Sequence, residues 1–415
     1  MIVIGAGAAG AVAAIFAAAA GADTLLVERT RDGGRKILIS GGGRCNILPA
    51  RLDESRFVSD APPHLVRRIV RSWPLREQID FFERDLGLPL VEEVESAKLF
   101  PASERARDVR DRLLEQARRN GARLLMNTTV TGFAPVDGGW RVDIADGAPL
   151  HAGAIVVATG GLSVPNTGSD GAGLRIIRNL GHEVRPTYAA LTPLLAQPAP
   201  FGELSGISLR VTITARADRL SSIATGGFLF THHGYSGPAV LDVSHVAVRS
   251  RMDGGVPARV VVRWTSLDDR AWTEALKPHG SKSVLSAVGD ALPARLAEAL
   301  IAGTGISARM PLANLSRAER VRLIDTLVRG TLPWTGDEGY KKAEVTGGGV
   351  SLNDIDPRTM ESRRHKRLFL CGEILDAFGP IGGYNFLWAW ATGRAAGLGA
   401  SAIIMGLPPT EGLSS

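Results

Sequence analysis

The sequence predicts an α/β fold in which a doubly wound, Rossmann-like domain is assembled from both ends of the chain. Residues 2–4 form a short apolar run typical of a buried strand, residues 11–20 are helix-forming, and residues 24–27 form a second apolar run. A βαβ opening of this kind implies a parallel sheet. Glycine-rich strand–turn–helix character returns after about residue 336, so we expect the nucleotide domain to be discontinuous.

The rest of the first part alternates between helical and strand-like segments. Residues 30–50 are rich in glycine and are expected to form a long loop. Helical spacing predicts helices over 62–86 and 104–120, and apolar alternation predicts strands over 124–133, 140–144 and 155–158.

The middle of the chain has a different character, which predicts an insertion. Short alternating strands between about residues 186 and 263 indicate a β-rich domain, and residues 266–332 have helical spacing. The predicted division is 1–187 for the first part of the nucleotide domain, 188–265 for the inserted β-rich domain, 266–335 for a small helical domain and 336–415 for the second part of the nucleotide domain.

Composition indicates an ordinary globular protein of two or three domains. The chain has 415 residues, of which 45% are hydrophobic and 22% charged. The net charge is +6, with 41 arginines and seven lysines among the 48 basic residues. The arginines are scattered along the sequence, so compositional bias explains them better than a nucleic-acid site, although a basic surface would attract an anionic cofactor or substrate.

Cysteine usage and the amino terminus bear on the compartment. The two cysteines, Cys45 and Cys371, cannot build a disulfide framework or a zinc site, and we expect no metal and a reducing, cytoplasmic environment. The first 22 residues carry no charge, but a basic segment of the kind that begins a signal peptide is missing. Their glycines interrupt the stretch too early for a membrane helix, and we expect no membrane association.

The first chemical motif is Gly5-Ala6-Gly7-Ala8-Ala9-Gly10, placed between the first strand and the first helix. Gly5 permits the tight turn, Gly7 lets the backbone approach a pyrophosphate, and Gly10 allows close packing of helix on strand. The amino terminus of the helix then faces the phosphates. Glu28 ends the second strand 18 residues after Gly10, where a carboxylate can accept bonds from ribose hydroxyls. The acid disfavours a 2′-phosphate, so FAD or NAD remain as ligands.

A second motif favours FAD over NAD. Gly34-Arg35-Lys36 precedes Ser40-Gly41-Gly42-Gly43-Arg44-Cys45-Asn46. Three consecutive glycines cost chain entropy unless the backbone must approach a ligand closely. An extended FAD runs along the sheet edge and requires such a loop, whereas a plain NAD dehydrogenase does not.

A third motif lies near the carboxyl end. An apolar strand stops at Gly372, Glu373 follows it, and Asp376 is placed to accept a bond from a ribityl hydroxyl. The run Gly382-Gly383-Tyr384-Asn385-Phe386 then opens a helix. The positive end of that helix could favour reduction of a flavin, which gains negative charge near N1 when reduced.

Several longer strings together resemble one bacterial family. They are GRK-x4-GGGRCN, residues 98–101, residues 230–238, residues 346–350 with 359–362, and CGE-x2-D-x3-P-x-GGYN. The chain is similar over nearly its whole length to the BaiN-like NAD(P)/FAD-dependent oxidoreductases, often labelled aminoacetone oxidase family FAD-binding enzymes. The resemblance implies an FAD domain of the glutathione-reductase type, interrupted by a β-barrel-like domain and a smaller helical part. The predicted cofactor-binding residues are Gly5, Gly7, Ala8, Ala9, Gly10, Glu28, Arg29, Arg35, Lys36, Ser40, Gly41, Gly42, Gly43, Arg44, Cys45, Asn46, Val130, Ala158, Thr159, Gly160, Gly372, Glu373, Asp376, Gly382, Gly383, Tyr384, Asn385 and Phe386.

The predicted reaction is hydride transfer between flavin N5 and a small organic substrate. Tyr384, His232 and His233 are candidate proton donors or acceptors. Cys45 has no C-x-x-C partner, so a redox dithiol is not expected. Because only one dinucleotide fingerprint is convincing, NAD(P)H is expected to bind transiently, if it is the electron donor.

Two rival functions are carried forward. A flavin-dependent RNA-modifying enzyme is suggested by the basic charge, although nucleic acid is not the favoured partner because no clustered arginine–lysine stripe or aromatic stacking motif is visible. A redox sensor that holds FAD as a structural ligand is the other rival. Substrate identity, reaction direction and oligomeric state are left open.

Overall fold

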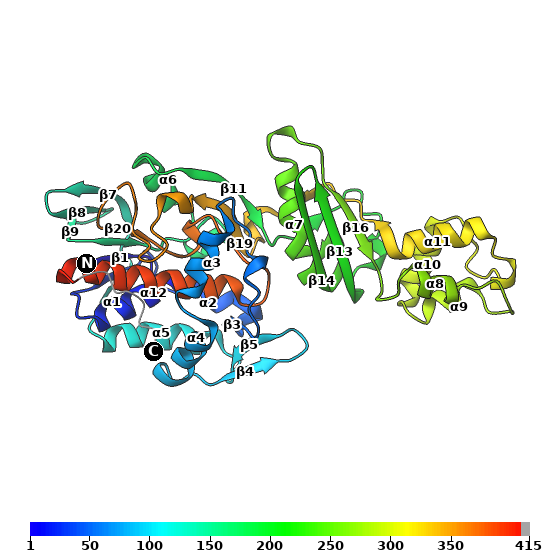
Figure 1. Cartoon of the computed structure of the whole chain (residues 1–415), viewed down its shortest axis with the longest axis horizontal. Helices are drawn as coiled ribbons and strands as arrows, with labels where there is room; N and C mark the ends of the chain where they lie inside the picture. The colour runs from blue at the N-terminus through cyan, green and yellow to red at the C-terminus, as the bar shows by residue number, and fades with distance from the viewer. Residues whose placement is uncertain (408–415) are drawn as a thin grey trace. The chain divides into compact units, whose positions relative to one another are not determined.

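The computed structural model describes residues 1–407, which divide into two compact units (Figure 1). The first unit contains Met1–Thr187 and the residues from Val345 onward, and the second contains Tyr188–Glu344. The chain therefore leaves and re-enters the first unit. Residues 336–344, which the sequence analysis assigned to the nucleotide domain, lie in the second unit because strand β18 (Gly336–Asp337) pairs with β12 (Leu194–Leu195) there.

A five-stranded parallel sheet organises the first unit. Its strand order is β20-β10-β1-β2-β6. Strand β10 therefore lies between β1, from the opening of the chain, and β20, from its last quarter. The central strand β1 pairs in register with a neighbour on each side, Ile4 lying opposite Val157 and Val27. The sheet strands are β1 (Ile2–Ile4), β2 (Leu25–Val27), β6 (Arg123–Leu125), β10 (Ile155–Val157) and β20 (Leu368–Leu370).

Three smaller sheets complete the strands around this unit. One is β3-β5-β4, another is β7-β8-β9, and β11 pairs with β19. Their bounds are β3 (Leu48–Pro49), β4 (Leu90–Glu93), β5 (Lys98–Pro101), β7 (Val130–Val136), β8 (Gly139–Ile144), β9 (Leu150–Ala152), β11 (Val184–Ala190) and β19 (Val345–Val350).

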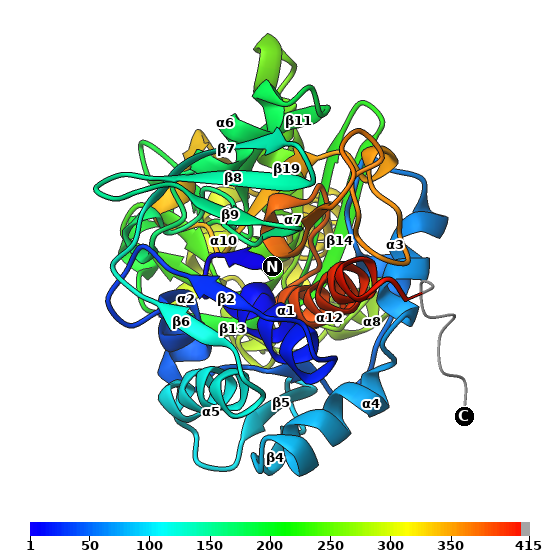
Figure 2. The ribbon, with the colours of Figure 1, turned by 90° about the vertical axis from the view of Figure 1, so that its left-hand side faces the viewer.

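Helices α1 and α12 pack together on one side of the parallel sheet, and β7–β9 lie on the other (Figure 2). Gly393 and Gly397 permit this closeness, since a Cβ atom at either position would lie 2.4 or 2.3 Å from the carbonyl oxygen of Ala9 or Ala13. The helices of the unit are α1 (Ala8–Ala19), α2 (Arg35–Ile39), α3 (Pro63–Arg71), α4 (Leu75–Asp80), α5 (Ala106–Arg119), α6 (Ala172–Asn179) and α12 (Tyr384–Met405).

The second unit is a seven-stranded sheet that shares one apolar core with a group of helices. The order is β17-β16-β13-β14-β15-β12-β18, and the long hairpin β13–β14 is antiparallel. Its remaining strands are β13 (Ser208–Ala217), β14 (Leu220–Thr231), β15 (Gly234–Ser236), β16 (Arg259–Arg263) and β17 (Gly330–Thr331). The helices are α7 (Pro238–Ser250), α8 (Asp269–Ala275), α9 (Val284–Gly289), α10 (Ala294–Gly303) and α11 (Arg317–Arg329).

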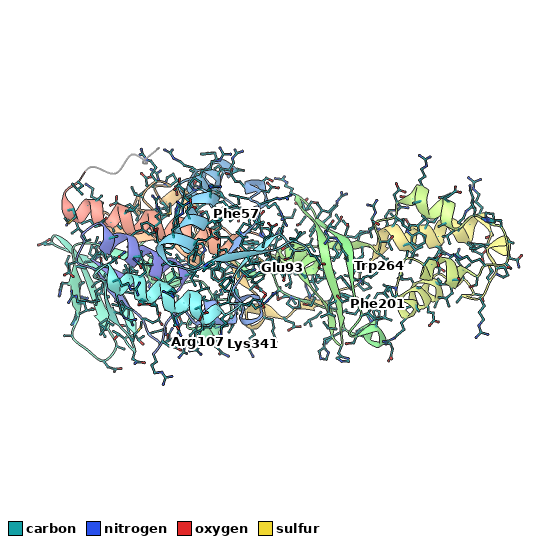
Figure 3. All side chains as sticks on the ribbon, turned by 90° about the horizontal axis from the view of Figure 1, so that it is seen from below. Phe57, Glu93, Arg107, Phe201, Trp264 and Lys341 are labelled. Carbon is teal, nitrogen blue, oxygen red and sulfur yellow. The ribbon has the colours of Figure 1, made fainter. Side chains whose placement is uncertain are left out.

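Aromatic side chains connect these strands and helices. Phe230 stacks on Trp264 with ring centroids 5.7 Å apart, and Phe201 contacts Trp264 edge-on at 6.5 Å (Figure 3). Buried residues from the sheet and from α8 to α11 belong to the same cluster. The β-rich and helical segments, expected as separate domains over 188–265 and 266–335, therefore form one unit with a common core.

Local structure differs from the sequence analysis in two places in the first unit. The expected loop over residues 30–50 contains α2 and a following 3-10 turn at Ser40–Gly43. The single strand expected over 124–133 is two strands, β6 in the parallel sheet and β7 in a separate antiparallel sheet. Within residues 1–407, no helix is both long enough and apolar enough to cross a membrane.

Candidate cofactor site

The amino terminus of α1 lies at the carboxyl end of β1, at the edge where the parallel strands end. Gly7 is the N-cap residue, and no side chain caps the helix. The first N–H groups of any helix lack an intrahelical partner, so those of α1 have no capping side chain in place of one. A Cβ atom at Gly7 would meet nothing within 4 Å, whereas one at Gly10 would lie 1.9 Å from the carbonyl oxygen of Gly5. The turn therefore combines tight packing at Gly10 with open space at Gly7, which is the arrangement a close-lying pyrophosphate requires.

Glu28 lies directly after β2 and is buried. One carboxylate oxygen accepts a hydrogen bond from the Ala6 backbone N–H at 2.8 Å. The other accepts from the Thr30 backbone N–H and hydroxyl, both at 2.7 Å. The carboxylate thus ties the glycine-rich turn to the loop after β2, and its predicted contact with a ribose stays a prediction.

Most cations of the predicted site are already paired with carboxylates. Arg29 pairs with Asp170 at 2.7 Å and Arg35 with Asp32 at 2.9 Å. Arg44 lies over the Phe100 ring at 4.2 Å and contacts two acids, Glu93 at 3.1 Å and Glu104 at 3.4 Å. These arginines hold the loop in place and leave Lys36 as the cation that enters the polar network described next.

That network joins four segments of the first unit around Glu373. Lys36 of α2 donates to the Glu373 carboxylate and to the Ser163 hydroxyl, and Ser163 donates to Glu373. Thr346 of β19 donates to the same carboxylate from its backbone N–H at 2.9 Å and from its hydroxyl at 2.8 Å. The Thr346 hydroxyl oxygen accepts from the N–H groups of Leu162, at 2.7 Å, and Ser163, at 3.0 Å.

Charge in this network is set by Lys36. Burial by itself would raise the pKa of the Glu373 carboxyl, but the Lys36 ammonium and the hydrogen bonds from Lys36, Ser163 and Thr346 outweigh it, so the pKa lies below its ordinary value. The carboxylate therefore stays ionised and fixes Lys36 near the start of α2.

The cysteines are not suited to redox chemistry. Cys45 is fully buried and has a backbone φ of 63°, and burial raises the pKa of its thiol to about 12. Burial also raises the pKa of Cys371, which follows β20. Both thiols stay protonated near neutral pH.

Glycines and polar side chains shape the turn before α12. A Cβ atom at Gly383 would lie 2.4 Å from the Leu48 carbonyl carbon, so the helix begins directly against β3. The Asn385 amide exchanges two hydrogen bonds with the Gly379 backbone, at 2.9 and 3.0 Å. Asp376 is buried and accepts from the Asp60 backbone N–H at 3.1 Å, so its predicted ribityl contact stays a prediction.

The candidate proton-transfer groups lie in two different units. Tyr384 is buried, and its hydroxyl accepts from the Asp53 N–H at 3.1 Å and donates to the Arg51 carbonyl at 3.4 Å. These bonds give Tyr384 a structural role at the start of α12. His232 and His233 are exposed at the turn between β14 and β15 of the second unit.

The remaining predicted residues line the strand ends. Ala158, Thr159 and Gly160 follow β10, Gly372 follows β20 by two positions, and Val130 begins β7. Phe386 stacks on Trp390 at 5.2 Å. Sequence reasoning did not place Ser163 and Thr346 in the site, because they come from segments 183 residues apart that only the fold joins. Thr346 belongs to a glycine-rich string, which was the available signal.

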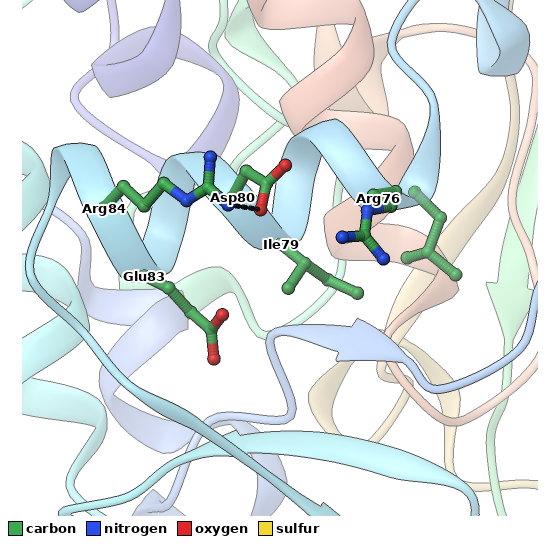
Figure 4. A pocket seen from close by; sticks show the side chains of 6 residues that line it. Arg76, Ile79, Asp80, Glu83 and Arg84 are labelled. Atoms are coloured by element: carbon green, nitrogen blue, oxygen red, sulfur yellow. Dashed lines mark ion pairs between the residues drawn. The ribbon is translucent and has the colours of Figure 1, made fainter.

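A separate hollow lies along α4 and the π-helical turn that continues it (Figure 4). Arg84 pairs with Asp80 there at 3.4 Å. Its lining consists of Leu75, Arg76, Ile79, Asp80, Glu83 and Arg84. None of the predicted cofactor residues belongs to it. Among residues 1–407, no three His, Cys, Asp or Glu side chains are grouped so that they could hold a metal ion.

The family assignment rests on a match over nearly the whole chain. The model of the HI0933-like protein Rossmann domain matches residues 1–399. The chain belongs to the HI0933-like family. HI0933-like proteins of this BaiN-like group are FAD-dependent oxidoreductases with a Rossmann-like FAD-binding domain, as the resemblance implied.

Relatives with curated names are similar over the same length. The ribosomal RNA dihydrouridine synthase of Escherichia coli (strain K12) is 32% identical over 397 residues, covering 95% of this chain and 96% of its own. The Haemophilus influenzae protein of the same name is 31% identical, covering 96% and 98%. The 3-dehydro-bile acid delta(4,6)-reductase of Clostridium scindens is 29% identical, covering 96% and 98%.

Among solved structures, Mycobacterium smegmatis Sdh1 in complex with UQ1 has a TM-score of 0.50 at 14% identity, covering 99% of this chain and 69% of that one. At this identity the likeness concerns the fold alone. A Cβ atom at Gly7 or at Gly42 would meet nothing within 4 Å, and the start of α1 carries no side-chain cap. Both features leave room for a closely approaching pyrophosphate and so fit an extended dinucleotide.

Proposed function

We propose that this chain is an FAD-dependent reductase that saturates a carbon–carbon double bond conjugated with a carbonyl group. The observation that carries the proposal is the shared chemistry in the names of its relatives. A 3-dehydro-bile acid delta(4,6)-reductase acts on double bonds near a ketone, and a dihydrouridine synthase saturates the ring double bond of uridine beside a carbonyl. The common reaction narrows the choice between reduction and oxidation that the residues left open.

When bound, FAD supplies a hydride from its N5 position to the substrate. The chain's own part is to hold the cofactor: the start of α1, with Gly7, would bind its pyrophosphate, and the glycines at 41–43 would let the backbone approach it. Lys36, which donates to the Glu373 carboxylate, places its ammonium group at the strand ends. Positive charge there would stabilise a reduced, anionic flavin.

The electron donor in this proposal is NAD(P)H. The reaction then balances as NAD(P)H plus a proton plus the unsaturated substrate, giving NAD(P)⁺ and the saturated product. A single dinucleotide fingerprint supports transient rather than permanent binding of the nicotinamide cofactor, since FAD takes that fingerprint.

Anaerobic stopped-flow spectroscopy tests the proposal. The FAD-loaded protein should lose its visible flavin absorbance when NADH or NADPH is added, and should regain it when a cyclic enone or a uridine-containing RNA is added. Amines and alcohols are electron donors and can only reduce the flavin. Reduction of the bound FAD by an amine or alcohol, with no reduction by NADH or NADPH, would therefore contradict the proposed direction.

A second candidate substrate is a uridine in RNA. It is favoured by the two ribosomal RNA dihydrouridine synthases, at 32% and 31% identity, and by the net charge of +6. The test is mass spectrometry of nucleosides from unmodified ribosomal RNA incubated with the protein, FAD and NADPH. Dihydrouridine at a defined position would support this candidate, and its absence alongside enone reduction would favour a small-molecule substrate.

A further inference from the structure

One face of the sheet in the second unit carries arginines and hydroxyl groups. Along β13 the buried residues Val211, Ile213 and Ala215 alternate with residues on the opposite, outward face. The same alternation holds along β16, where Val260 and Val262 are buried. The outward positions of these two strands include four arginines, exposed or half-buried: Arg210, Arg216, Arg259 and Arg263.

The strand register brings the arginines together. Arg216 lies directly opposite Arg259, and Arg263 lies opposite Thr212, two positions from Arg210. Directly opposite residues on antiparallel strands have Cβ atoms about 5 Å apart, and like charges in that relation destabilise the sheet. An anion bound between the two side chains would remove the repulsion.

The neighbouring outward positions contribute no acid that could play this part. They are Ser208, Thr212, Thr214, Ser221, Ile223, Thr225, Gly227, Leu229, Val261 and Thr331. Among the described residues, no hydrogen bond or ion pair joins any of the four arginines to a carboxylate. Asp269, whose pKa is lowered first by its hydrogen bond to Arg329 and to a smaller extent by Arg263, is committed to Arg329.

We infer that this arginine face, defined by Arg210, Arg216, Arg259 and Arg263, docks the phosphate backbone of RNA. The inference rests on the second candidate substrate, a uridine in RNA. Arginine forks match phosphate oxygens geometrically, and threonine and serine hydroxyls donate to the same groups. No aromatic side chain occupies the outward positions named above, so the face recognises the backbone and not the bases.

A binding titration with the full-length, FAD-loaded protein tests the inference. The probe is a fluorescein-labelled single-stranded oligouridylate of about 20 nucleotides. The test variant is Arg216→Gln/Arg259→Gln, and the matched control is Arg309→Gln/Arg317→Gln, which removes two exposed arginines of the same unit outside the face. The test variant should bind at least about tenfold more weakly, and the slope of log affinity against log salt should fall by about 1.4, for two lost phosphate contacts.

Thermal unfolding provides a readout that misfolding would not reproduce. Because Arg216 and Arg259 repel each other, the test variant should unfold at the same or a higher temperature than the wild type. Weaker RNA binding together with a lowered unfolding temperature would overturn the inference, as would an equal loss of binding in the control.

The remaining outcomes separate the face from the function. If the wild type and the test variant bind RNA equally, the arginine face is wrong, but RNA remains a candidate substrate. Wild-type protein that reduces an enone but does not bind the oligouridylate would overturn both the face and the RNA candidate. Wild-type binding to vesicles containing phosphatidylserine, in preference to RNA, would overturn the inference in favour of a membrane surface.

Discussion

Glu373 carries more of the first unit's polar contacts than its position after a short strand suggests. Its carboxylate receives donors from α2, from the segment after β10 and from β19. A carboxyl group accepts several such bonds with both oxygens only while it is ionised, because protonation turns one oxygen into a donor. The geometry of the strand ends therefore depends on the ionisation of one side chain.

Glu373→Gln should reduce the free energy of unfolding by about 2 kcal/mol at neutral pH, since hydrogen bonds to a charged group are lost and Lys36 loses its counter-ion. The folded-state pKa of Glu373 is lowered, so its contribution is full above the ordinary pKa of about 4.3 and declines as the pH falls through the folded pKa. Urea unfolding between about pH 7 and about pH 2 measures this difference.

The control for that comparison is Glu95→Gln, an exposed carboxylate to which no hydrogen bond is assigned. It should change stability by less than about 0.5 kcal/mol at every pH. A difference between wild type and Glu373→Gln that grows as the pH is lowered would contradict the assigned network.

Thiol reactivity tests the burial of the two cysteines. Because the pKa of Cys45 is about 12 and that of Cys371 is also raised, neither thiol should react quickly with a disulfide reagent at about pH 8 in the folded protein. Unfolding in guanidinium should release both. Rapid reaction of either thiol in the native state would contradict its burial, and rapid reaction of Cys45 in particular would show that the loop around it opens.

At this scale the sequence predicted residue types better than residue roles. The motif around Tyr384 was recognisable, but a phenol after two glycines looks the same whether it faces a substrate or bonds the backbone at Arg51 and Asp53. Ser163 carries no motif at all. Its role depends on the distance between the ends of β10 and β20, which follows from sheet order.

Among the elements, the turn between β1 and α1 is the one on which cofactor binding most depends. Its glycines have different surroundings. A side chain at Gly7 would enter open space, whereas one at Gly10 would collide with the Gly5 carbonyl group. This difference makes a matched pair of substitutions possible.

Gly7→Ala should fold like the wild type, because Gly7 has a φ of −77° and open space for a methyl group. That methyl group would occupy the place of the pyrophosphate, so FAD affinity should fall at least about tenfold, a loss of about 1.4 kcal/mol. Fluorescence titration of the apoprotein with FAD measures the change. Wild-type FAD affinity in Gly7→Ala would contradict the assignment of the turn.

Gly10→Ala is the comparison for Gly7→Ala. Its Cβ atom would lie only 1.9 Å from the Gly5 carbonyl oxygen, so the substitution forces α1 away from the sheet. We expect a stability loss of about 1–3 kcal/mol in addition to weaker FAD binding. Thermal unfolding without added FAD separates the two effects.

Elements with strong local patterns were predicted well. The opening strand, helix and strand appear as β1, α1 and β2 within a few residues of the expected bounds. The segment 124–133 was misread because the apolar pattern does not show that the chain changes sheets between β6 and β7. The α2 helix has only five residues, too few to show a period.

For the whole molecule, the two-part first unit follows from the return of glycine-rich motifs near the carboxyl end. The shared core of the second unit does not follow from the sequence, because β16, α11 and the hairpin β13–β14 meet only through long-range pairing. For the same reason the scattered arginines gave no visible stripe, although the register places four of them on one face.

The most direct test of the account is an anaerobic FAD titration followed by reduction and reoxidation of the purified full-length chain. We predict that the protein binds about one FAD per chain, that NADH or NADPH bleaches its visible spectrum, and that an unsaturated carbonyl compound or a uridine-containing RNA restores it. A colourless protein that does not take up FAD at micromolar concentration, or a bound flavin that neither nicotinamide reduces, would contradict the account.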